Sequence, residues 1–391
     1  MGELYQLVPR RMCTVTQDQT FLNGYSGAVN SDGTLTWNGV VLDSGRPQRI
    51  RGAWLQWCPS APEGQEVARR EEITEHVPVQ DVGLMVLGGL EVLRGVPTAG
   101  HTYNFRQGLW HENTPLSVNR DEAAIAQYDN KVYVLGGNDS SGPMRNILKS
   151  VEVYDVVSDA WSSLAPMQEA RERAAAVHVQ SGLYVCGGAS SDHMLTPSAE
   201  VYHTSGWERI ADLPTPRSGL GLVALGSKLF ACGGESEWRT QDTVEIYDIP
   251  REVWLDGPPM LQPRANFGIA VLGRCIFVAG GSEQLPAKRT GERRRLASME
   301  RFDERIGNWR QCAPMLTARS FVSLTVKDSL IYAVGGCNDG PVADVETYDP
   351  RTDNWAPAPP LPTRRYGHGS VLVRTCRFLA DPPSKRSSNC S

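Results

Sequence analysis

Two adjacent glycines occur six times in this chain at a nearly constant interval, and no other feature of the sequence constrains its fold as strongly. The pairs begin at residues 88, 136, 187, 233, 280 and 335, so the intervals are 48, 51, 46, 47 and 55 residues. Each pair follows a short apolar run such as KVYVL (131–135) or LIYAV (330–334). Recurrence at this period indicates a repeat architecture in which each repeat is one supersecondary unit.

Three further residue types recur in phase with the glycines. Five tryptophans stand 26 residues before the next pair, an arginine stands ten residues after each tryptophan, and a tyrosine or phenylalanine usually stands seven residues before it. The tryptophans are Trp110, Trp161, Trp207, Trp254 and Trp309, with Trp355 as a sixth, and the arginines are Arg120, Arg171, Arg217, Arg264, Arg319 and Arg365. Tyr202 departs from the pattern because it precedes its tryptophan by five. We call these six arginines the repeat arginines.

Each repeat reads as four short strands separated by Gly, Pro and Asp. One follows the arginine, one ends at Gly-Gly, one resembles SVEVYD (150–155), and one carries the tryptophan. Adjacent glycines permit a sharp bend and a close backbone approach. A single four-stranded sheet cannot cover its tryptophan, but sheets stacked in a closed ring can. The sequence therefore predicts an all-β, six-bladed propeller.

The recurring order of Gly-Gly, Tyr-Asp, Trp, Pro-Met and Arg resembles the kelch repeat over residues 83–380. Among kelch proteins the chain looks most like the kelch-like group, whose members usually carry BTB and BACK domains ahead of a six-bladed propeller. The resemblance implies a non-catalytic protein-interaction module, the substrate-recognition subunit of a cullin-RING E3 ubiquitin ligase. It leaves two alternatives: an actin-binding or cytoskeletal scaffold, and, more remotely, a copper radical oxidase.

Ring closure can be predicted from the two ends of the repeat region. RYGHGSVLV (365–373) matches RSGLGLVAL (217–225), but Asp381 and Pro382 stand where its Gly-Gly would fall. We therefore expect residues 366–374 to supply the inner strand of the blade that starts near residue 83. The competing assignment gives that position to residues 73–80. The expected domains are an irregular or partly disordered segment (1–75), the propeller (76–380) and a flexible C-terminal tail (381–391).

The N-terminal segment does not continue the repeat. Residues 1–75 are rich in Gly, Asn, Asp and Ser. A BTB domain needs on the order of a hundred residues with several amphipathic helices, and this segment shows no helical periodicity. Cullin binding is therefore expected only if the full product has a BTB domain. A fragment, a shortened isoform and a standalone propeller all fit the sequence.

Composition limits the partners and the compartment. The formal net charge of −5 argues against a nucleic-acid backbone as partner, and no apolar run is long enough to span a bilayer. The nine cysteines contain no CxxC pair, which favours a reducing cytoplasm. The seven histidines form no HxH or HxxxH pair, so the sequence predicts no metal site, no cofactor and no enzyme activity. We expect a protein or peptide client.

The resemblance places recognition on the face where the loops after Gly-Gly meet the residues after the repeat arginines. From the first set the candidates are Glu91, Asn138, Asp139, Ser190, Glu235, Glu283, Asn338 and Asp339. From the second set they are Asp121, Glu122, Glu172, Arg173, Ser218, Asn266, Ser320 and Tyr366. The repeat arginines themselves are expected to tie loops together by charge-assisted hydrogen bonds.

Charge on this face suggests two opposed preferences. Acidic candidates outnumber the single arginine, which favours a basic or hydrogen-bonding peptide. The longest interval contains an insertion, residues 283–298, whose basic residues could instead bind an acidic motif: Lys288, Arg289, Arg293, Arg294 and Arg295. Ser298 lies three residues after Arg295, as in a basophilic kinase site, but it also occupies the position of Ser150 at the start of a third strand.

Overall fold

The computed structural model describes the propeller over residues 81–91, 99–139, 146–190, 194–237, 239–285 and 292–375, and eight strands between residues 2 and 59. The chain divides into two compact units. One comprises Met1–Val79 with Phe378–Ser391, and the other comprises Gln80–Arg377.

The first unit contains short antiparallel strands in two four-stranded sheets, ordered β2-β1-β8-β7 and β3-β4-β5-β6. The strands are β1 (Gly2–Val8), β2 (Arg11–Val15), β3 (Phe21–Leu22), β4 (Tyr25–Val29), β5 (Leu35–Trp37), β6 (Val40–Leu42), β7 (Gln48–Ile50) and β8 (Ala53–Pro59). Residues outside the described ranges join several of them.

The second unit is a six-bladed propeller, as the repeat period predicts. Every blade is an antiparallel sheet of four strands, which are named from the central channel outwards. Blade I is β38 (Arg365–Thr375), β9 (Asp81–Glu91), β10 (His101–Asn104) and β11 (Leu109–Glu112); blade II is β12 (Ala124–Tyr128), β13 (Lys131–Leu135), β16 (Val151–Asp155) and β17 (Ala160–Leu164); blade III is β18 (Ala175–Val179), β19 (Gly182–Cys186), β20 (Ala199–His203) and β21 (Gly206–Ile210).

The remaining blades repeat the same order. Blade IV is β22 (Gly221–Leu225), β23 (Lys228–Cys232), β26 (Val244–Asp248) and β27 (Val253–Gly257); blade V is β28 (Gly268–Leu272), β29 (Cys275–Ala279), β32 (Met299–Asp303) and β33 (Asn308–Cys312); blade VI is β34 (Ser323–Lys327), β35 (Leu330–Val334), β36 (Val345–Asp349) and β37 (Asn354–Ala358). The innermost strand of each blade contacts those of both neighbouring blades, so the ring is closed.

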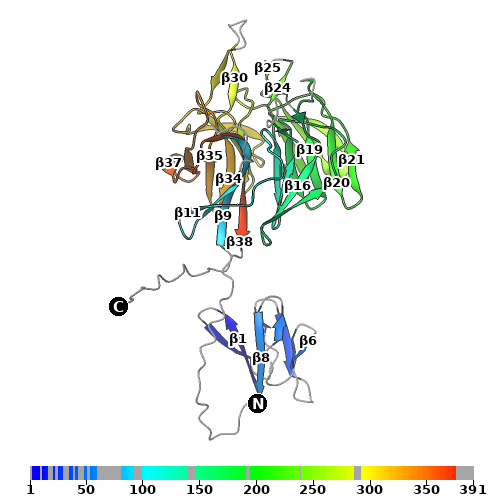
Figure 1. Ribbon diagram of the computed structural model, residues 1–391, viewed down its shortest axis with the longest axis vertical. Helices are drawn as coiled ribbons and strands as arrows, with labels where there is room; N and C mark the ends of the chain where they lie inside the picture. The colour runs from blue at the N-terminus through cyan, green and yellow to red at the C-terminus, as the bar shows by residue number, and fades with distance from the viewer. Residues whose placement is uncertain are drawn as a thin grey trace, which may run out of the picture. The chain divides into compact units, whose positions relative to one another are not determined.

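Blade I joins the two ends of the ring. β38 pairs antiparallel with β9 from Arg365 opposite Glu91 to Thr375 opposite Asp81, and Figure 1 shows the two strands side by side. The prediction that residues 366–374 supply the inner strand is confirmed. The competing assignment of residues 73–80 to this position is wrong because β38 fills it.

Three blades carry a small hairpin after their Gly-Gly pair. The hairpins are β14 (Asn138–Asp139) with β15 (Asn146–Ile147), β24 (Glu235–Ser236) with β25 (Arg239–Thr240), and β30 (Ser282–Gln284) with β31 (Arg293–Arg295). β30 projects from the same end of the propeller as β24 and β25 (Figure 1). The one helical element among the described residues is a 3₁₀ turn, η1 (Ile249–Arg251), which leads into β27.

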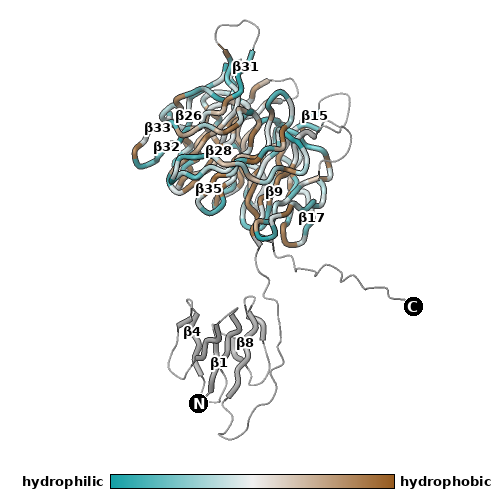
Figure 2. The backbone as a smooth tube through the Cα atoms, turned by 90° about the vertical axis from the view of Figure 1, so that its left-hand side faces the viewer, coloured by the Kyte–Doolittle hydropathy of each residue, from teal (hydrophilic) through white to brown (hydrophobic). Residues whose placement is uncertain are grey.

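Aromatic pairs form the outer core of every blade. A tyrosine or phenylalanine on the third strand lies opposite the tryptophan on the fourth, with ring centroids 5.0–5.4 Å apart. Tyr202 keeps this pairing with Trp207 despite its shorter spacing, because β20 and β21 are joined by a shorter turn. Apolar segments lie inside the propeller in Figure 2, where the blades stack on one another.

The glycine and arginine columns meet where one blade follows the next. Both glycines of each pair have positive φ, and a Cβ on Gly136 would lie 2.3 Å from the carbonyl oxygen of Arg171. Arg171 is fully buried and donates to the carbonyl oxygens of Gly187 and Ser198, each at 2.9 Å. The other five repeat arginines are also buried and donate to the equivalent glycine carbonyl at 2.8–3.4 Å. The geometry therefore agrees with the structural role that the sequence predicts for the repeat arginines.

A buried glutamate faces the arginine in blades II to VI. The pairs are Arg120–Glu152, Arg171–Glu200, Arg217–Glu245, Arg264–Glu300 and Arg319–Glu346, with N–O distances of 2.5–3.0 Å. Burial lowers the pKa of Arg217, Arg264 and Arg319, and the facing glutamate opposes this shift. The carboxylates also accept backbone N–H bonds from the preceding turn, as Glu300 does from Leu261 at 2.6 Å. Each pair thus fastens the connection from the preceding blade to the third strand of the blade that follows it.

Ser298 belongs to the same structural network. Its hydroxyl accepts from Arg264 at 3.3 Å and donates to the side-chain oxygen of Gln262 at 2.6 Å. Ser150 contacts Arg120 in the same way, at 2.7 Å. The geometry favours the structural interpretation of Ser298 over the kinase-site interpretation.

Candidate functional site at the channel mouth

The residue two positions after each repeat arginine lies at the mouth of the central channel. These six residues, which we call the mouth ring, are Glu122, Arg173, Gly219, Asn266, Phe321 and Gly367. All six have a left-handed backbone, with φ between 53° and 67°. Because only glycine adopts this conformation without cost, the four side chains are held there by the surrounding fold.

Backbone hydrogen bonds connect the mouth ring from blade to blade. The N–H groups of successive members donate to the preceding member: Glu122 to Gly367 (2.9 Å), Arg173 to Glu122 (2.9 Å), Gly219 to Arg173 (2.8 Å), Asn266 to Gly219 (2.8 Å) and Phe321 to Asn266 (2.6 Å). Between blades VI and I, the rings of Phe321 and Tyr366 meet edge-on at 5.6 Å. The ring therefore presents its side chains on a fixed frame.

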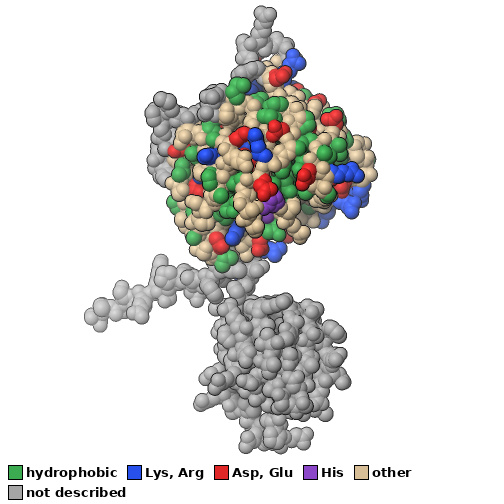
Figure 3. Space-filling view, turned by 90° about the vertical axis from the view of Figure 1, so that its right-hand side faces the viewer, with side chains coloured by type: hydrophobic (Ala, Val, Ile, Leu, Met, Phe, Trp, Pro, Cys, Tyr) green, Lys and Arg blue, Asp and Glu red, His purple; other side chains and the backbone are tan. Residues whose placement is uncertain are grey.

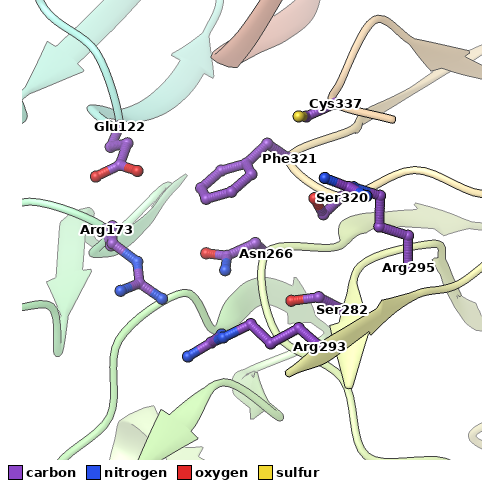
Figure 4. Close-up of a pocket in the computed structure, with 9 residues that line it drawn as sticks. All are labelled: Glu122, Arg173, Asn266, Ser282, Arg293, Arg295, Ser320, Phe321 and Cys337. Carbon is purple, nitrogen blue, oxygen red and sulfur yellow. The ribbon is translucent and has the colours of Figure 1, made fainter. Parts of the chain in front are cut away.

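A cavity of about 320 Å³ opens beside the mouth ring. Figure 4 shows its lining side chains converging from several blades. They are Glu122, Arg173, Asn266, Ser282, Arg293, Arg295, Ser320, Phe321 and Cys337. The cavity thus combines three guanidinium groups, one carboxylate, several neutral hydrogen-bonding groups and one aromatic wall.

The β30–β31 hairpin brings two of these arginines to the mouth. The side chains of Arg293 and Arg295 reach the cavity, and Arg294, between them, bonds Glu283 at 2.6 Å. Arg293 contacts the carboxylate of Glu235 on blade IV, and Arg295 lies 2.8 Å from Asp339 on blade VI. The basic strand β31 is therefore paired with acidic groups from three blades.

Glu235 is shared by two arginines from different blades. Arg173 donates to it at 2.8 Å from blade III, and Arg293 contacts it from blade V. Burial, and after it the neighbouring charge of Arg173, lowers the pKa of Arg293. The Nε atom of Arg173 is buried and has no partner among the described residues. Because two guanidinium groups share the single carboxylate of Glu235, this part of the mouth keeps a net positive charge.

The structure brings together the two sets of loops that the sequence selected. The residue after each arginine pairs with the residue after Gly-Gly, as Asp121 does with Asn138 and Ser320 with Cys337. Five candidates are nevertheless buried, although Ser320 among them lines the cavity: Asn138, Glu172, Ser218, Glu235 and Ser320. Each of the five takes part in a backbone bridge between the two loops.

The other candidates are partly or fully accessible. Asn338 and Asp339 are exposed, and those that are half-buried are Asp121, Glu122, Asp139, Arg173, Ser190, Asn266, Glu283 and Tyr366. The backbone of Glu91 lies at the end of β9, but its side chain is outside the described residues, as are Lys288 and Arg289 of the basic insertion. The binding role of all these residues stays a prediction.

Charge on this face is distributed differently from the acidic rim that the sequence suggested. Glu235, Glu283 and Asp339 are paired with the hairpin arginines, and Glu172 is buried. Asp121, Glu122 and Asp139 remain accessible carboxylates, so the expected preference for a basic peptide stays a prediction. Elsewhere, on the side that Figure 3 shows, acidic and basic side chains are interspersed without a large patch of one sign.

Sequence reasoning missed three residues of the cavity: Ser282, Phe321 and Cys337. A signal for them was present, because Phe321 stands in the same column as Glu122, Arg173 and Asn266, two residues after a repeat arginine. Ser282 and Cys337 likewise stand directly after a Gly-Gly pair. The position of a residue within the repeat therefore identifies the residues of the cavity better than the polarity of its side chain does.

The two histidines of the inner strands have separate environments. His178 stacks on Tyr128 at 4.2 Å, whereas His368 is buried and lies 3.1 Å from the carbonyl oxygen of Val334. Within the described part of the chain, no three His, Cys, Asp or Glu residues are grouped to hold a metal ion. No helix there is long and apolar enough to cross a membrane.

Comparison with known proteins follows the same repeats. A family model described as the kelch motif matches residues 119–168, 216–261, 263–316 and 318–362. This chain is a kelch-repeat propeller. Its kelch motifs correspond to the blade boundaries set by the repeat arginines, and a solved structure titled "Structure of YjhT" shares the fold, with a TM-score of 0.61 over 72% of this chain and 95% of that one at 16% identity.

Curated kelch proteins resemble the chain over parts of their length. Kelch-like protein 40 of Xenopus tropicalis is 33% identical over 158 residues, which is 39% of this chain and 25% of that protein. Kelch-like protein 38 of Mus musculus is 24% identical over 300 residues, 74% of this chain and 49% of that protein. Alpha-scruin of Limulus polyphemus is 27% identical over 296 residues, 69% of this chain and 31% of that protein. The chain thus spans between a quarter and a half of these relatives.

Proposed function

We propose that the propeller is a non-catalytic recognition module that binds a peptide segment of a client protein at the channel mouth. The observation that carries this proposal is the mouth ring, whose backbone is fixed while side chains of different chemistry converge on one cavity. A concave site with an apolar wall and a few placed polar groups suits a small ligand or a peptide side chain.

We further propose that the bound client is presented to a cullin-RING ubiquitin ligase. Similarity to Kelch-like proteins 40 and 38 supports this role, which requires a BTB domain in the full product. The cytoplasm suits it because the described cysteines are free and burial raises the pKa of Cys186 and Cys232 to about 12. Such thiols are inert toward oxidation.

The alternative is a cytoskeletal scaffold that binds actin. This alternative is supported by the similarity of 69% of the chain to Alpha-scruin, whose name does not place it in the kelch-like group. Co-sedimentation of the purified chain with filamentous actin would support the scaffold, whereas recovery of a cullin with the chain from cells would support the ligase.

Affinity purification with mass spectrometry tests the recognition face. The baits are the wild-type chain, a mouth variant (Arg173→Ala, Asn266→Ala, Phe321→Ala) and a control variant (Val157→Ser, Ile306→Ser). The control changes two exposed side chains in turns between third and fourth strands, at the opposite end of the blades. We expect clients that the wild type and the control retain and the mouth variant loses. Identical partners for all three baits would reject the channel mouth as the recognition site.

A further inference from the structure

The β30–β31 hairpin brings guanidinium groups to the channel mouth. Blade V alone contributes two arginines from one strand, and Arg173 of blade III adds a third. Their exposed side-chain fractions are 40% for Arg293, 35% for Arg295 and 21% for Arg173, so these charges are partly removed from water but can still be reached. Guanidinium groups in such surroundings form strong, often bidentate bonds with carboxylates.

The internal partners of these arginines leave room for an incoming acid. Glu235 is divided between two guanidinium groups, so neither arginine has a carboxylate to itself. Asp339, the partner of Arg295, is 90% exposed. An ion pair so exposed is worth little, because water screens it and an exposed side chain must be ordered to form it. An acidic ligand can therefore replace Asp339 at small cost.

The geometry of the strand sets the spacing of the ligand. Arg293 and Arg295 are alternate residues of β31, so they lie on one side of the strand, roughly 6.5–7 Å apart along it. Arg294 faces away and is engaged by Glu283. An extended peptide has the same repeat, so its acidic side chains at positions i and i+2 lie on one face at the same separation. Figure 4 shows that Phe321 lines the same cavity as the two arginines, where its ring can contact an apolar neighbour of the acids.

We infer that the mouth selects an extended client segment with acidic side chains at two alternate positions. This inference rests on the proposed function and names its ligand class. Arg293 and Arg295 read the two acids, and Arg173 adds a donor to the first of them. Arg294 does not take part in recognition.

Selection from a random peptide library tests the inference. A phage-displayed library of random nonapeptides is panned on the full chain. Selected peptides are measured by isothermal titration against the wild type, the mouth variant (Arg173→Ala, Asn266→Ala, Phe321→Ala), the double variant Arg293→Gln/Arg295→Gln, and Arg294→Gln. The last variant is a control for loss of charge, since it removes one positive charge from the same strand on its other side.

We expect enrichment of Asp or Glu at i and i+2, at least about tenfold weaker binding by the double variant, and less than about twofold change for Arg294→Gln. Binding should also weaken as salt is raised. Equal losses in both variants would show a non-specific charge effect and overturn the inference. Thermal unfolding of each variant identifies any loss that comes from misfolding.

The outcomes separate this inference from the proposed function. Selected peptides without alternate acids that still lose binding in the mouth variant (Arg173→Ala, Asn266→Ala, Phe321→Ala) would overturn the ligand class and leave peptide recognition at the mouth standing. Selected peptides that bind all variants equally would overturn both.

Discussion

Blade I and the other five blades have the same four-stranded form but are held together by different means. Blades II to VI are each continuous in sequence, with inner strands of five residues. Blade I is assembled from both ends of the repeat region, and its two inner strands, β38 and β9, have eleven residues each. No tight turn connects these two strands, so their longer backbone pairing replaces a covalent link.

Side chains in blade I also depart from the repeat columns. His101 stands where the other blades have the buried glutamate, and its Nδ1 lies 3.0 Å from the guanidinium of Arg365. His368 occupies a column that is apolar in the other five blades, for example Leu220 in blade IV. The indole nitrogen of Trp110 is buried without a partner among the described residues, whereas the other five indoles donate to a carbonyl of the preceding blade at 2.7–2.9 Å.

The difference between blade I and the other blades indicates which polar contacts the ring needs at each junction. In blades II to VI an indole hydrogen bond fixes each blade on its neighbour, and an ion pair fastens the connection that leads into the blade. At the junction of blades VI and I, the packing includes the edge-on contact of Phe105 with Tyr332 at 5.3 Å and Lys327 lying 4.7 Å from the ring of Phe105. Blade I, where long strand pairing closes the ring, therefore lacks the Arg–Glu ion pair and the indole hydrogen bond of the other blades among the described residues.

The largest expected contrast concerns the partner of the repeat arginine. Glu300→Ala in blade V leaves the fully buried Arg264 without its carboxylate, and we expect a loss of about 3–5 kcal/mol in the free energy of unfolding. His101→Ala in blade I removes a neutral acceptor, and Arg365 keeps its bonds to Ala99 and Thr363, so we expect about 1–2 kcal/mol. Urea unfolding of both variants measures the two values.

Equal losses in these two variants would contradict the comparison, because they would mean that His101 stabilises Arg365 as strongly as a carboxylate does. Glu304→Ala is a suitable control, since Glu304 lies on the same blade near the exposed Arg274 and its removal is expected to change stability by less than about 0.5 kcal/mol.

A second contrast concerns the pH dependence of stability. Blade I contains the buried His368, whose protonation should make the free energy of unfolding depend on pH. Burial, and then the charge of Arg365, lowers the pKa of His368 to about 3, below its ordinary value of 6.5. The unfolded chain therefore binds a proton that the folded chain does not, and stability falls as pH drops through 6.5 toward 3. From pH 7 to pH 5 the loss from this one group is about 2 kcal/mol.

His368→Leu places in blade I the residue type that blade IV has at Leu220, and it should remove this part of the pH dependence. Urea unfolding of the wild type and the variant at pH 7 and pH 5 gives the comparison, in which other titrating groups cancel. The same loss of stability in both proteins would show that His368 is not buried in its neutral form. His111→Leu, which alters a half-buried histidine of the same blade, serves as the control for replacing a histidine by leucine.

The fold could be predicted from the sequence because its signals recur. Six Gly-Gly pairs, six tryptophans and six arginines set the blade number, and the absence of a seventh Gly-Gly pair after Trp355 located the closing strand at residues 366–374. The hydrogen bonds of the repeat arginines were also predictable, since a buried guanidinium needs acceptors. Their glutamate partners stand in a fixed column of the third strand and were overlooked.

The site was predictable only in outline. The two sets of loops were chosen correctly, but which of their residues are buried depends on bridges between loops, as at Ser218 with Glu235. The pairing of the hairpin arginines depends on contacts between blades that are far apart in sequence, such as Arg295 with Asp339. These contacts depend on the position that the β30–β31 hairpin takes over the neighbouring blades. The order of residues in a single sequence does not specify that position.

The smallest contrast is between two tryptophans that differ by one hydrogen bond. Trp161→Phe loses the bond from its indole to the carbonyl oxygen of Thr114 at 2.9 Å, while Trp110→Phe removes a buried donor that has no acceptor in the described structure. Both side chains are half-buried and lose the same atoms. We therefore expect Trp161→Phe to cost about 0.5–1.5 kcal/mol more than Trp110→Phe in urea unfolding. A larger cost at Trp110 would show that its indole has found an acceptor in solution, and that the junction of blades VI and I is fastened like the other five.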